Sequence, residues 1–346
     1  MSLGAEGGRN PTRQDVARRA HTSLATVSYV VNNGPKRVSA QTRDRVLRAI
    51  AELGYRPDPV ARSFRGVDDG AIGMLVPNFN GPFFADLVAE VERQAVSRGK
   101  VVLFGSTGYD PAAESSLMQT FRDRRVGAVL IIGPTPHVKA PGIEHGALNV
   151  LRMTGGHRAV AIGIAQREAT RAVVQHLFDH GRRRVAALFG PTSHGVFNVR
   201  YRGWKDVAAY TPQQTRDLVR RSDYSFHGGY TATLELFDQA HAPDGLFVSN
   251  DTQAVGALKA LNHLGFRVPD DVAVVSIDST ELSPFLVPSL TSISQPTGLL
   301  AEAALDVVEG IVAQDQTTVR VPFTLEVRDS CGCGERTPAG ETSAGH

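Results

Sequence analysis

At 346 residues, 42% of them hydrophobic, the chain is long enough for two or three domains that each bury a core. It has no run of eighteen apolar residues, and its polar beginning lacks the apolar stretch of a secretion signal. Membrane and exported proteins are therefore disfavoured, and a cytoplasmic protein is expected. The net charge of +2 conceals a basic head, because residues 1–66 hold 12 Lys and Arg against 5 Asp and Glu, while the rest hold 25 against 30. Such a head favours a polyphosphate partner.

Three short helices are predicted between residues 12 and 54. Thr12, with Asp15 three residues later, has the spacing of a capping box and begins the first helix. Ser23 begins the second helix after a two-residue turn, and Ser39 begins the third, which Gly54 ends. Three helices within about fifty residues, with so short a turn between the first two, are typical of a helix-turn-helix domain. The apolar residues expected to pack them together are Val16, Ala17, Ala20, Val27, Val30, Val31, Val46, Leu47, Ile50, Ala51 and Leu53.

The remainder divides by composition. Residues 1–10 are predicted to be a flexible arm, residues 11–57 the helix-turn-helix domain, and residues 58–67 a short hinge helix or plain linker that orders only when something packs on it. In residues 68–330 apolar runs alternate with helical stretches, which predicts parallel sheets covered on both faces. Residues 331–346 are predicted to be a disordered tail. The expected strands are 71–77, 101–105, 128–133, 148–153, 160–164, 185–190, 245–250 and 272–278.

Linked motifs carry a resemblance to a known family. DVARRA, S-x-x-TVS-x-VVN, VS-x-x-TR-x-RV, AIAELGYRP and VARSFRG resemble the head of the lactose-repressor/purine-repressor family of bacterial transcription regulators. FNGPFFADLVAEVERQAVSRG, RYRGW, SNDTQAVGALKAL and SPFLVPSLTSISQP resemble the rest of that family. The resemblance implies an all-α helix-turn-helix head followed by two doubly wound parallel-sheet α/β lobes of periplasmic-binding-protein type. It further implies a homodimer that binds a palindromic double-stranded operator, with repression as the favoured regulatory role. A small effector in the interlobe cleft, a sugar, sugar phosphate or related metabolite, would modulate its operator affinity.

The family's second helix enters the major groove, which implies where this chain contacts DNA. Tyr29 stands where the family usually has Arg, so the preferred half-site should differ from the commonest one. Phe64 falls where the family inserts an apolar wedge, usually Leu, between central base pairs. His21 replaces a frequent Gly in the turn. Each single cation has the alternative of being a solvated surface charge. The predicted DNA-binding residues are Thr12, Arg13, Thr22, Ser23, Leu24, Ala25, Thr26, Ser28, Tyr29, Asn32, Lys36, Arg37, Val38, Arg62 and Phe64.

The same resemblance implies an effector site at the carboxyl ends of the strands. Arg200 matches the family's effector-gripping arginine and Asp278 its ligand carboxylate, with a salt pair between them as the alternative. The alternative role of Asp251 is that of a helix cap, and the alternative for the aromatic pair Phe83 and Phe84 is core packing. The predicted effector-binding residues are Phe83, Phe84, Arg152, Arg200, Asn250, Asp251 and Asp278.

Two departures from the family concern the ligand. Where many relatives have Asp-Arg after the fourth strand, this chain has Arg152-Met153, and where they have Asp-Asn before the next helix, it has Ala165-Gln166. Both changes remove an acid near the cleft, and one adds a cation, for which a solvent-facing position is the alternative. Either a ligand more anionic than a neutral sugar or the loss of effector binding would follow.

Enzyme, cofactor and metal signals are weak. Nucleophile-elbow, Walker, HExxH and dinucleotide-binding spacings are all absent from the sequence, so no catalytic function and no cofactor are predicted. His176 and His180 form an i, i+4 pair, but a position near a helix carboxyl end explains them. Cys331 and Cys333 have no ligand residues nearby in sequence, so no metal site is predicted. A solute-binding protein without gene regulation, or a cleft hydrolase or isomerase, is the alternative function.

Overall fold

The structure, a computed structural model, describes residues 11–31, 38–55, 70–77, 81–133, 148–153, 158–191, 195–238, 241–313 and 315–333. The chain divides into two compact units, residues 1–69 and residues 70–346. Across these described ranges, no helix is both long and apolar enough to cross a membrane. The predicted boundaries of the hinge fall within residues 56–69, which lie outside the described residues.

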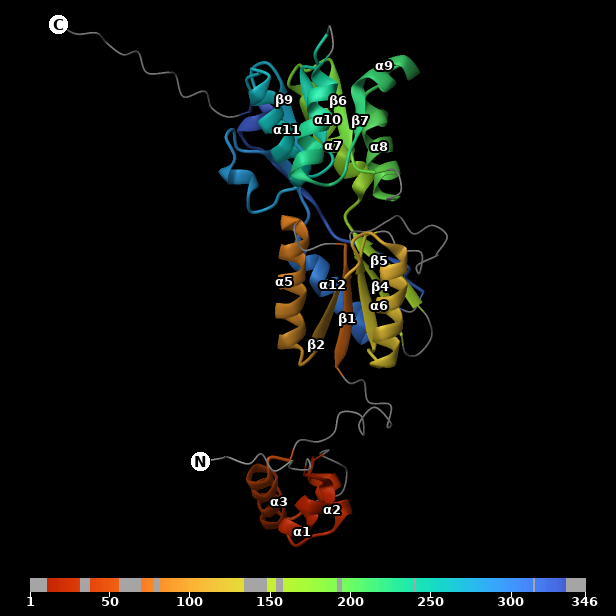
Figure 1. The fold of residues 1–346 in the computed structure, drawn as a ribbon, viewed down its shortest axis with the longest axis vertical. Coiled ribbons are helices and arrows are strands. Elements are labelled where there is room, and N and C mark those ends of the chain that lie inside the picture. Colours follow the sequence, from red (N-terminus) through yellow and green to blue (C-terminus); the bar gives the residue numbers. More distant parts are fainter. Residues whose placement is uncertain are drawn as a thin grey trace, which may run out of the picture. The chain divides into compact units, whose positions relative to one another are not determined.

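The first unit contains the three predicted helices, α1 (Arg13–Arg19), α2 (Leu24–Val31) and α3 (Ala40–Leu53) (Figure 1). The capping box of Thr12 and Asp15 is present, Ser39 accepts a hydrogen bond from the amide of Thr42, and Gly54 ends α3 with φ of 63°. These capping predictions are confirmed. The helix ends of this unit are thus determined by local side chains, as the sequence suggested.

A small apolar core joins the three helices. Val16, Val27 and Val46 are fully buried in it, one from each helix, and Tyr55 closes it after α3. Leu47, expected in this core, is 48% exposed, because residues 46 and 49 rather than 47 face inward on α3. The head therefore has one exposed leucine on α3 that packing does not require.

The second unit consists of two α/β lobes (Figure 1). Lobe 1 has a six-stranded sheet of order β11-β5-β4-β3-β1-β2, with α5 and α12 packed on one face and α6 on the other. Its elements are β1 (Ala71–Val76), α5 (Pro82–Ser97), β2 (Val101–Ser106), α6 (Pro111–Asp123), β3 (Ala128–Ile132), β4 (Leu148–Arg152), β5 (Arg158–Gly163), α12 (Thr297–Glu309) and β11 (Thr318–Arg320).

Lobe 2 repeats this architecture with a sheet of order β12-β10-β9-β8-β6-β7. Helices α7 and α8 cover one face, and α10 and α11 cover the other. Its elements are α7 (Gln166–Asp179), β6 (Val185–Phe189), α8 (Gly195–Val207), α9 (Pro212–Leu218), β7 (Val219–Arg221), α10 (Phe226–Phe237), β8 (Gly245–Val248), α11 (Asp251–His263), β9 (Ala273–Asp278), η1 (Ser283–Phe285), β10 (Thr291–Ser294), β12 (Thr324–Glu326) and η2 (Asp329–Cys331).

The chain passes between the lobes three times, from β5 to α7, from β10 to α12 and from β11 to β12. The expected doubly wound fold is confirmed, with a correction to its strands. Both sheets are mixed, because β4 runs antiparallel to β3 and β5, and β12 runs antiparallel to β10. The eight predicted strands are present, whereas β7, β10, β11 and β12 were not predicted, since these short strands (VRR, TSIS, TVR and TLE) contain no continuous apolar run.

Candidate functional site

The outward face of α2 is the part of the head that its core leaves free. Val27 and Val30 point into the core, so the helix turns Leu24 and Ala25 to the surface, where Leu24 is 49% exposed. Tyr29 is half-buried on the same helix. A short helix with exposed small and apolar residues at its amino end has the composition that packs on base edges and thymine methyl groups.

Local hydrogen bonds hold this face in place. His21 has φ of 49°, so the turn requires the left-handed backbone conformation at this position. Histidine adopts it here, at the position where the family resemblance places a frequent Gly. The Ser23 hydroxyl accepts a hydrogen bond from the amide of Thr26 at 3.1 Å, which caps α2 as predicted. Thr22 is half-buried just before this cap. The amino end of α2 is therefore fixed without any partner molecule.

Other predicted DNA-binding residues have varied surroundings. Thr12 caps α1, and the Arg13 Nε donates to the Tyr55 hydroxyl at 3.2 Å, which draws Arg13 toward the end of α3. Val38 packs against the head core, and Ser28 is half-buried on α2. The predicted residues that lie outside the described part of the chain are Asn32, Lys36, Arg37, Arg62 and Phe64.

In lobe 2 a chain of hydrogen bonds links the two groups expected to bind effector. The Arg200 Nε donates to Gln166 Oε1 at 2.9 Å, and the Gln166 amide donates to Gln295 Oε1 at 2.9 Å. The Gln295 amide then donates to Asp278 Oδ1 at 2.7 Å. Within the described residues Arg200 and Asp278 are thus linked through two glutamines, both next to crossovers between the lobes, in place of a direct salt pair. We call Arg200, Gln166, Gln295 and Asp278 the inter-lobe polar cluster.

Asp278 is the strained member of this cluster. It ends β9 with φ of 126° and is almost fully buried. Burial raises the pKa of Asp278 to about 7, with Asp251 adding to the rise while Arg200 and Gln295 oppose it. Backbone strain and a displaced pKa at one carboxyl group are typical of functional positions.

Two tyrosines that sequence reasoning missed lie beside this cluster. Burial raises the pKa of Tyr224, and Arg200 and Asp278 are near enough to influence it. Its ring fills the space that a side chain at Gly190 would occupy. Tyr109 belongs to lobe 1, yet its pKa is raised by partial burial and then by Tyr224 and Asp278 of lobe 2. These tyrosines belong to no motif, so only the tertiary structure brings them together.

Asp251 has a structural environment. Its carboxylate accepts hydrogen bonds from the hydroxyls of Ser276, Ser292, Ser283 and Thr280 and from the amide of Thr280. These contacts tie α11 to β9, β10 and η1 and occupy both carboxylate oxygens. We therefore assign Asp251 to the lobe framework.

The residue that caps α11 is Asn250, the neighbour of Asp251. The Asn250 side chain accepts from the amide of Gln253 at 2.9 Å, so the cap role considered for Asp251 belongs to Asn250. The aromatic pair packs edge to face, with ring centroids 5.8 Å apart. Phe83 is buried in the lobe 1 core and Phe84 packs against it, which favours the core-packing alternative for Phe83.

The effector role predicted for Arg152 is corrected by strand direction. Because β4 is antiparallel, its last residue pairs with Ala128, the first residue of β3, and with Arg158, the first residue of β5. Arg152 therefore lies at the sheet edge opposite the carboxyl ends of the parallel strands, with its guanidinium beside Gly310 at the end of α12. The sequence pattern gave strand position but not strand direction, so the proposed extra cation is absent from the inter-lobe cluster.

A second correction concerns the two cysteines. They were expected to have no ligand residues nearby, but η2 brings them to the carboxyl end of α7, where His176 and His180 lie. Burial raises the pKa of the Cys331 thiol, yet hydrogen bonds from His176, Thr291 and Cys333 lower it overall to about 6. The two histidine and cysteine motifs are thus parts of one cluster.

Two family models match the chain. Residues 12–58 match "Bacterial regulatory proteins, lacI family", and residues 174–331 match "Periplasmic binding protein-like domain". The first match covers the three-helix unit, and the second covers most of lobe 2 together with α12 and β11. The first match lies within the first unit of the structure, and the second match lies within the second unit.

Individual proteins match over nearly the whole chain. A ribose operon repressor of Halalkalibacterium halodurans (strain C-125) is 31% identical over 331 residues, 94% of this chain and 98% of that protein. The crystal structure of a lac repressor dimer bound to operator and the anti-inducer ONPF has a TM-score of 0.78 at 26% identity, covering 93% of this chain and 99% of the other. A complex of the transcriptional regulator CelR with cellobiose has a TM-score of 0.61 at 27% identity, covering 93% and 100%.

Proposed function

Since the chain belongs to the LacI family of bacterial regulatory proteins, it is a DNA-binding transcription regulator with an effector-binding domain, and we propose that it acts as a homodimeric repressor in the cytoplasm. The observation that carries the proposal is the capped helix α2, whose outward face is free of core contacts. The relatives described above are repressors and regulators rather than enzymes or solute carriers.

We propose that α2 enters the major groove of a palindromic operator. Leu24 and Ala25 pack against thymine methyl groups, and the Tyr29 hydroxyl forms a hydrogen bond with one base edge. Thr22, Ser23, Thr26 and Ser28 supply backbone contacts, as do Thr12, Arg13 and the residues predicted beyond the described part. Phosphate contacts position the head, while the α2 face selects the sequence.

A homodimer is supported by exposed apolar side chains in lobe 2. Phe285 is 77% exposed and Val287 is 95% exposed, and Leu282 adjoins them. In lobe 1, Val96 and Val101 are also well exposed. Apolar surface of this kind marks association sites, and a two-fold dimer places two α2 helices on the half-sites of a palindrome.

The inter-lobe polar cluster, together with the adjacent Tyr109 and Tyr224, is the proposed effector site. A guanidinium, a carboxyl group and two tyrosine hydroxyls suit a ligand with several hydroxyl groups, and the complex of the relative CelR with cellobiose agrees with a sugar. Because Arg152 lies elsewhere, the argument for a strongly anionic ligand loses its cation, and a sugar becomes the first candidate. Ligand would shift the lobes through the crossovers that carry Gln166 and Gln295.

Selection of duplexes from a random pool by the full-length protein tests this function. We expect enrichment of one palindrome whose affinity falls steeply with salt. Leu24→Ala and Leu47→Ala form a matched pair, because both leucines are about half exposed in the head. Only Leu24→Ala should alter the enriched sequence. Equal weak binding to every duplex would contradict the proposal.

A further inference from the structure

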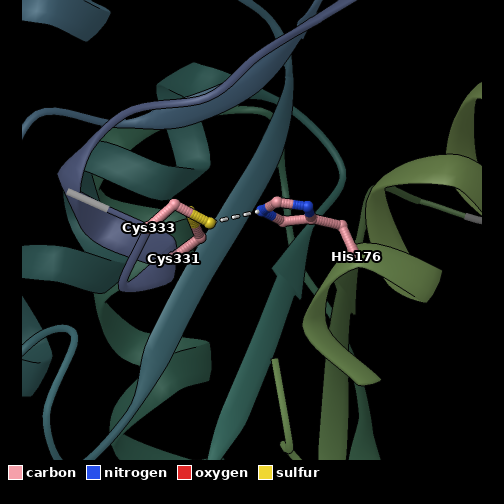
Figure 2. Close-up of side chains that lie close together, drawn as sticks. All are labelled: His176, Cys331 and Cys333. Carbon is pink, nitrogen blue, oxygen red and sulfur yellow. Dashed lines mark hydrogen bonds between the residues drawn. The ribbon is translucent and has the colours of Figure 1, made fainter. Parts of the chain in front are cut away.

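Two histidines and two cysteines that lie far apart in the sequence meet on one side of lobe 2. His176 is in the last turn of α7 and His180 follows its end, while Cys331 ends η2 and Cys333 lies two residues later. Figure 2 shows the His176 ring directed at the thiol of Cys333, with Cys331 beside it. The residues come from two segments about 150 positions apart, so the fold alone assembles them.

The distances suit a single metal ion. Cys333 Sγ lies 3.3 Å from His176 Nε2 and 2.8 Å from His180 Nε2. The donor atoms of His176, Cys331 and Cys333 all lie within 4.8 Å of one another. Around a tetrahedral Zn²⁺, bonds of about 2.0–2.3 Å place neighbouring ligand atoms roughly 3.3–3.8 Å apart. His176, Cys331 and Cys333 therefore have the spacing of three ligands of one ion, and His180, beside Cys333, would supply the fourth after a small shift of its side chain.

Backbone geometry fixes the two thiols before any metal arrives. Gly332 has φ of 91°, which lets the chain reverse between the cysteines. The thiols of Cys331 and Cys333 both lie within 4.8 Å of a ring nitrogen of His176 on α7. The Ser330 hydroxyl donates to the Val274 carbonyl at 2.7 Å and accepts from the Thr291 amide at 2.8 Å. The cysteine turn is thus anchored on β9 and β10, independently of the histidines.

The second histidine is held in the orientation that ligation needs. His180 Nδ1 lies 2.7 Å from the carbonyl oxygen of His176, so Nδ1 carries the proton and donates it. The lone pair of His180 is then on Nε2, the atom that faces Cys333. A hydrogen bond from the other ring nitrogen to a carbonyl is the usual support of a metal-bound histidine.

We propose that His176, His180, Cys331 and Cys333 form a Cys₂His₂ site for zinc. Two thiolates and two imidazoles match the donor set of structural zinc, and two thiolates balance the charge of the ion. Cys331 is fully buried and His180 is exposed, so the ion sits at the surface with a protein-filled inner side. The ion joins η2 and Cys333 to α7, the helix whose first residue, Gln166, belongs to the inter-lobe polar cluster.

Cobalt binding tests the site with the untagged full-length protein, reduced and stripped of metal. We expect one Co²⁺ per chain, with the thiolate charge-transfer band and the visible bands of tetrahedral cobalt, displaced by one equivalent of Zn²⁺. Cys333→Ser and His176→Gln should abolish the charge-transfer spectrum or shift it to lower intensity, and His180→Ala should weaken affinity at least about tenfold. His263→Gln, another histidine of lobe 2, should behave as wild type.

The proposal is overturned if the reduced protein shows no charge-transfer band when Co²⁺ is added. A spectrum unchanged in both Cys333→Ser and His176→Gln has the same meaning. A Cys331–Cys333 disulfide that forms readily, in a protein that takes up no metal after reduction, would assign the pair to redox chemistry instead. Circular dichroism of each variant separates loss of the ligand from loss of the fold, and His180→Ala, at an exposed position, provides a test that does not disturb the core.

Discussion

The outward face of α2 and the inter-lobe polar cluster are the two proposed recognition sites, and they differ in whether their residues also contribute to folding. On α2, Leu24 and Ala25 are exposed and take no part in the head core, which packs on the other side of the helix through Val27 and Val30. In the cluster, Arg200 and Asp278 are buried and hydrogen-bonded to the glutamines beside the crossovers. Sequence preference for DNA is therefore separable from folding, whereas effector recognition is not. Substitutions on α2 should change binding alone, and substitutions around the cluster should change stability first.

The largest expected effect is that of Asp251→Ala. It leaves four hydroxyls and one amide in the lobe 2 interior without their acceptor, which should lower the free energy of unfolding by about 3–5 kcal/mol. Urea unfolding followed by the fluorescence of Trp204, the one tryptophan and fully buried in lobe 2, measures it. Asn250→Ala, which removes only a helix cap, should cost about 1 kcal/mol. Equal effects of the two would show that Asp251 is not part of the framework.

The pH dependence of stability should follow from Asp278. Its pKa is raised to about 7 in the folded protein, so between about pH 4 and pH 7 the folded chain retains a proton that the unfolded chain has released. The contribution of Asp278 to stability is therefore fully present below about pH 4 and is lost as pH rises toward 7, by about 2–4 kcal/mol. Asp278→Asn should flatten the slope. Urea unfolding of both proteins at several pH values checks this, and identical slopes would refute the assignment.

On α2, Leu24→Ala should weaken operator binding by about 1–3 kcal/mol without a matching loss of stability. Leu47→Ala, equally exposed but on α3, should leave operator affinity within about twofold of wild type. Fluorescence anisotropy with a labelled operator gives both affinities. If the two variants lose affinity equally, the α2 face is not the surface that contacts DNA.

The smallest expected change is that of Tyr29→Phe. It removes one hydroxyl from a half-buried ring, so affinity for the best operator should fall by about 1 kcal/mol or less. The preference at a single base pair in each half-site should relax at the same time. Repeating the duplex selection with this variant shows whether one position changes, and an unaltered profile would remove Tyr29 from the base-contacting set.

Features that depend on neighbours in sequence were predicted, and features that depend on distant residues were not. The capping box at Thr12, the turn at His21 and the end of α3 at Gly54 depend on neighbours within a few residues, and all were predicted. The effector role of Arg152 was predicted wrongly, because the direction of β4 depends on its pairing with strands that are distant in sequence. Tyr109 and Tyr224 belong to different lobes, and only folding places them together.

The histidine and cysteine motifs illustrate the limit most clearly. Each motif is a weak metal signal by itself in the sequence, because His176 and Cys333 are 157 residues apart. Asp251 shows the converse, since a conspicuous motif residue turned out to be engaged inside its own lobe. Motif position therefore indicates candidate residues, while the partners of each residue in space determine its environment.

The most direct test of the whole account is the operator affinity of the full-length protein, with and without a sugar that stabilises it in a thermal-shift screen. For the wild type the sugar should change the operator Kd by at least about tenfold, within the range of 1–3 kcal/mol typical of coupled sites. For Arg200→Gln, which breaks the inter-lobe polar cluster, the change should be under about twofold. The same operator Kd with and without every stabilising sugar, or an undiminished response in Arg200→Gln, would contradict the proposed coupling.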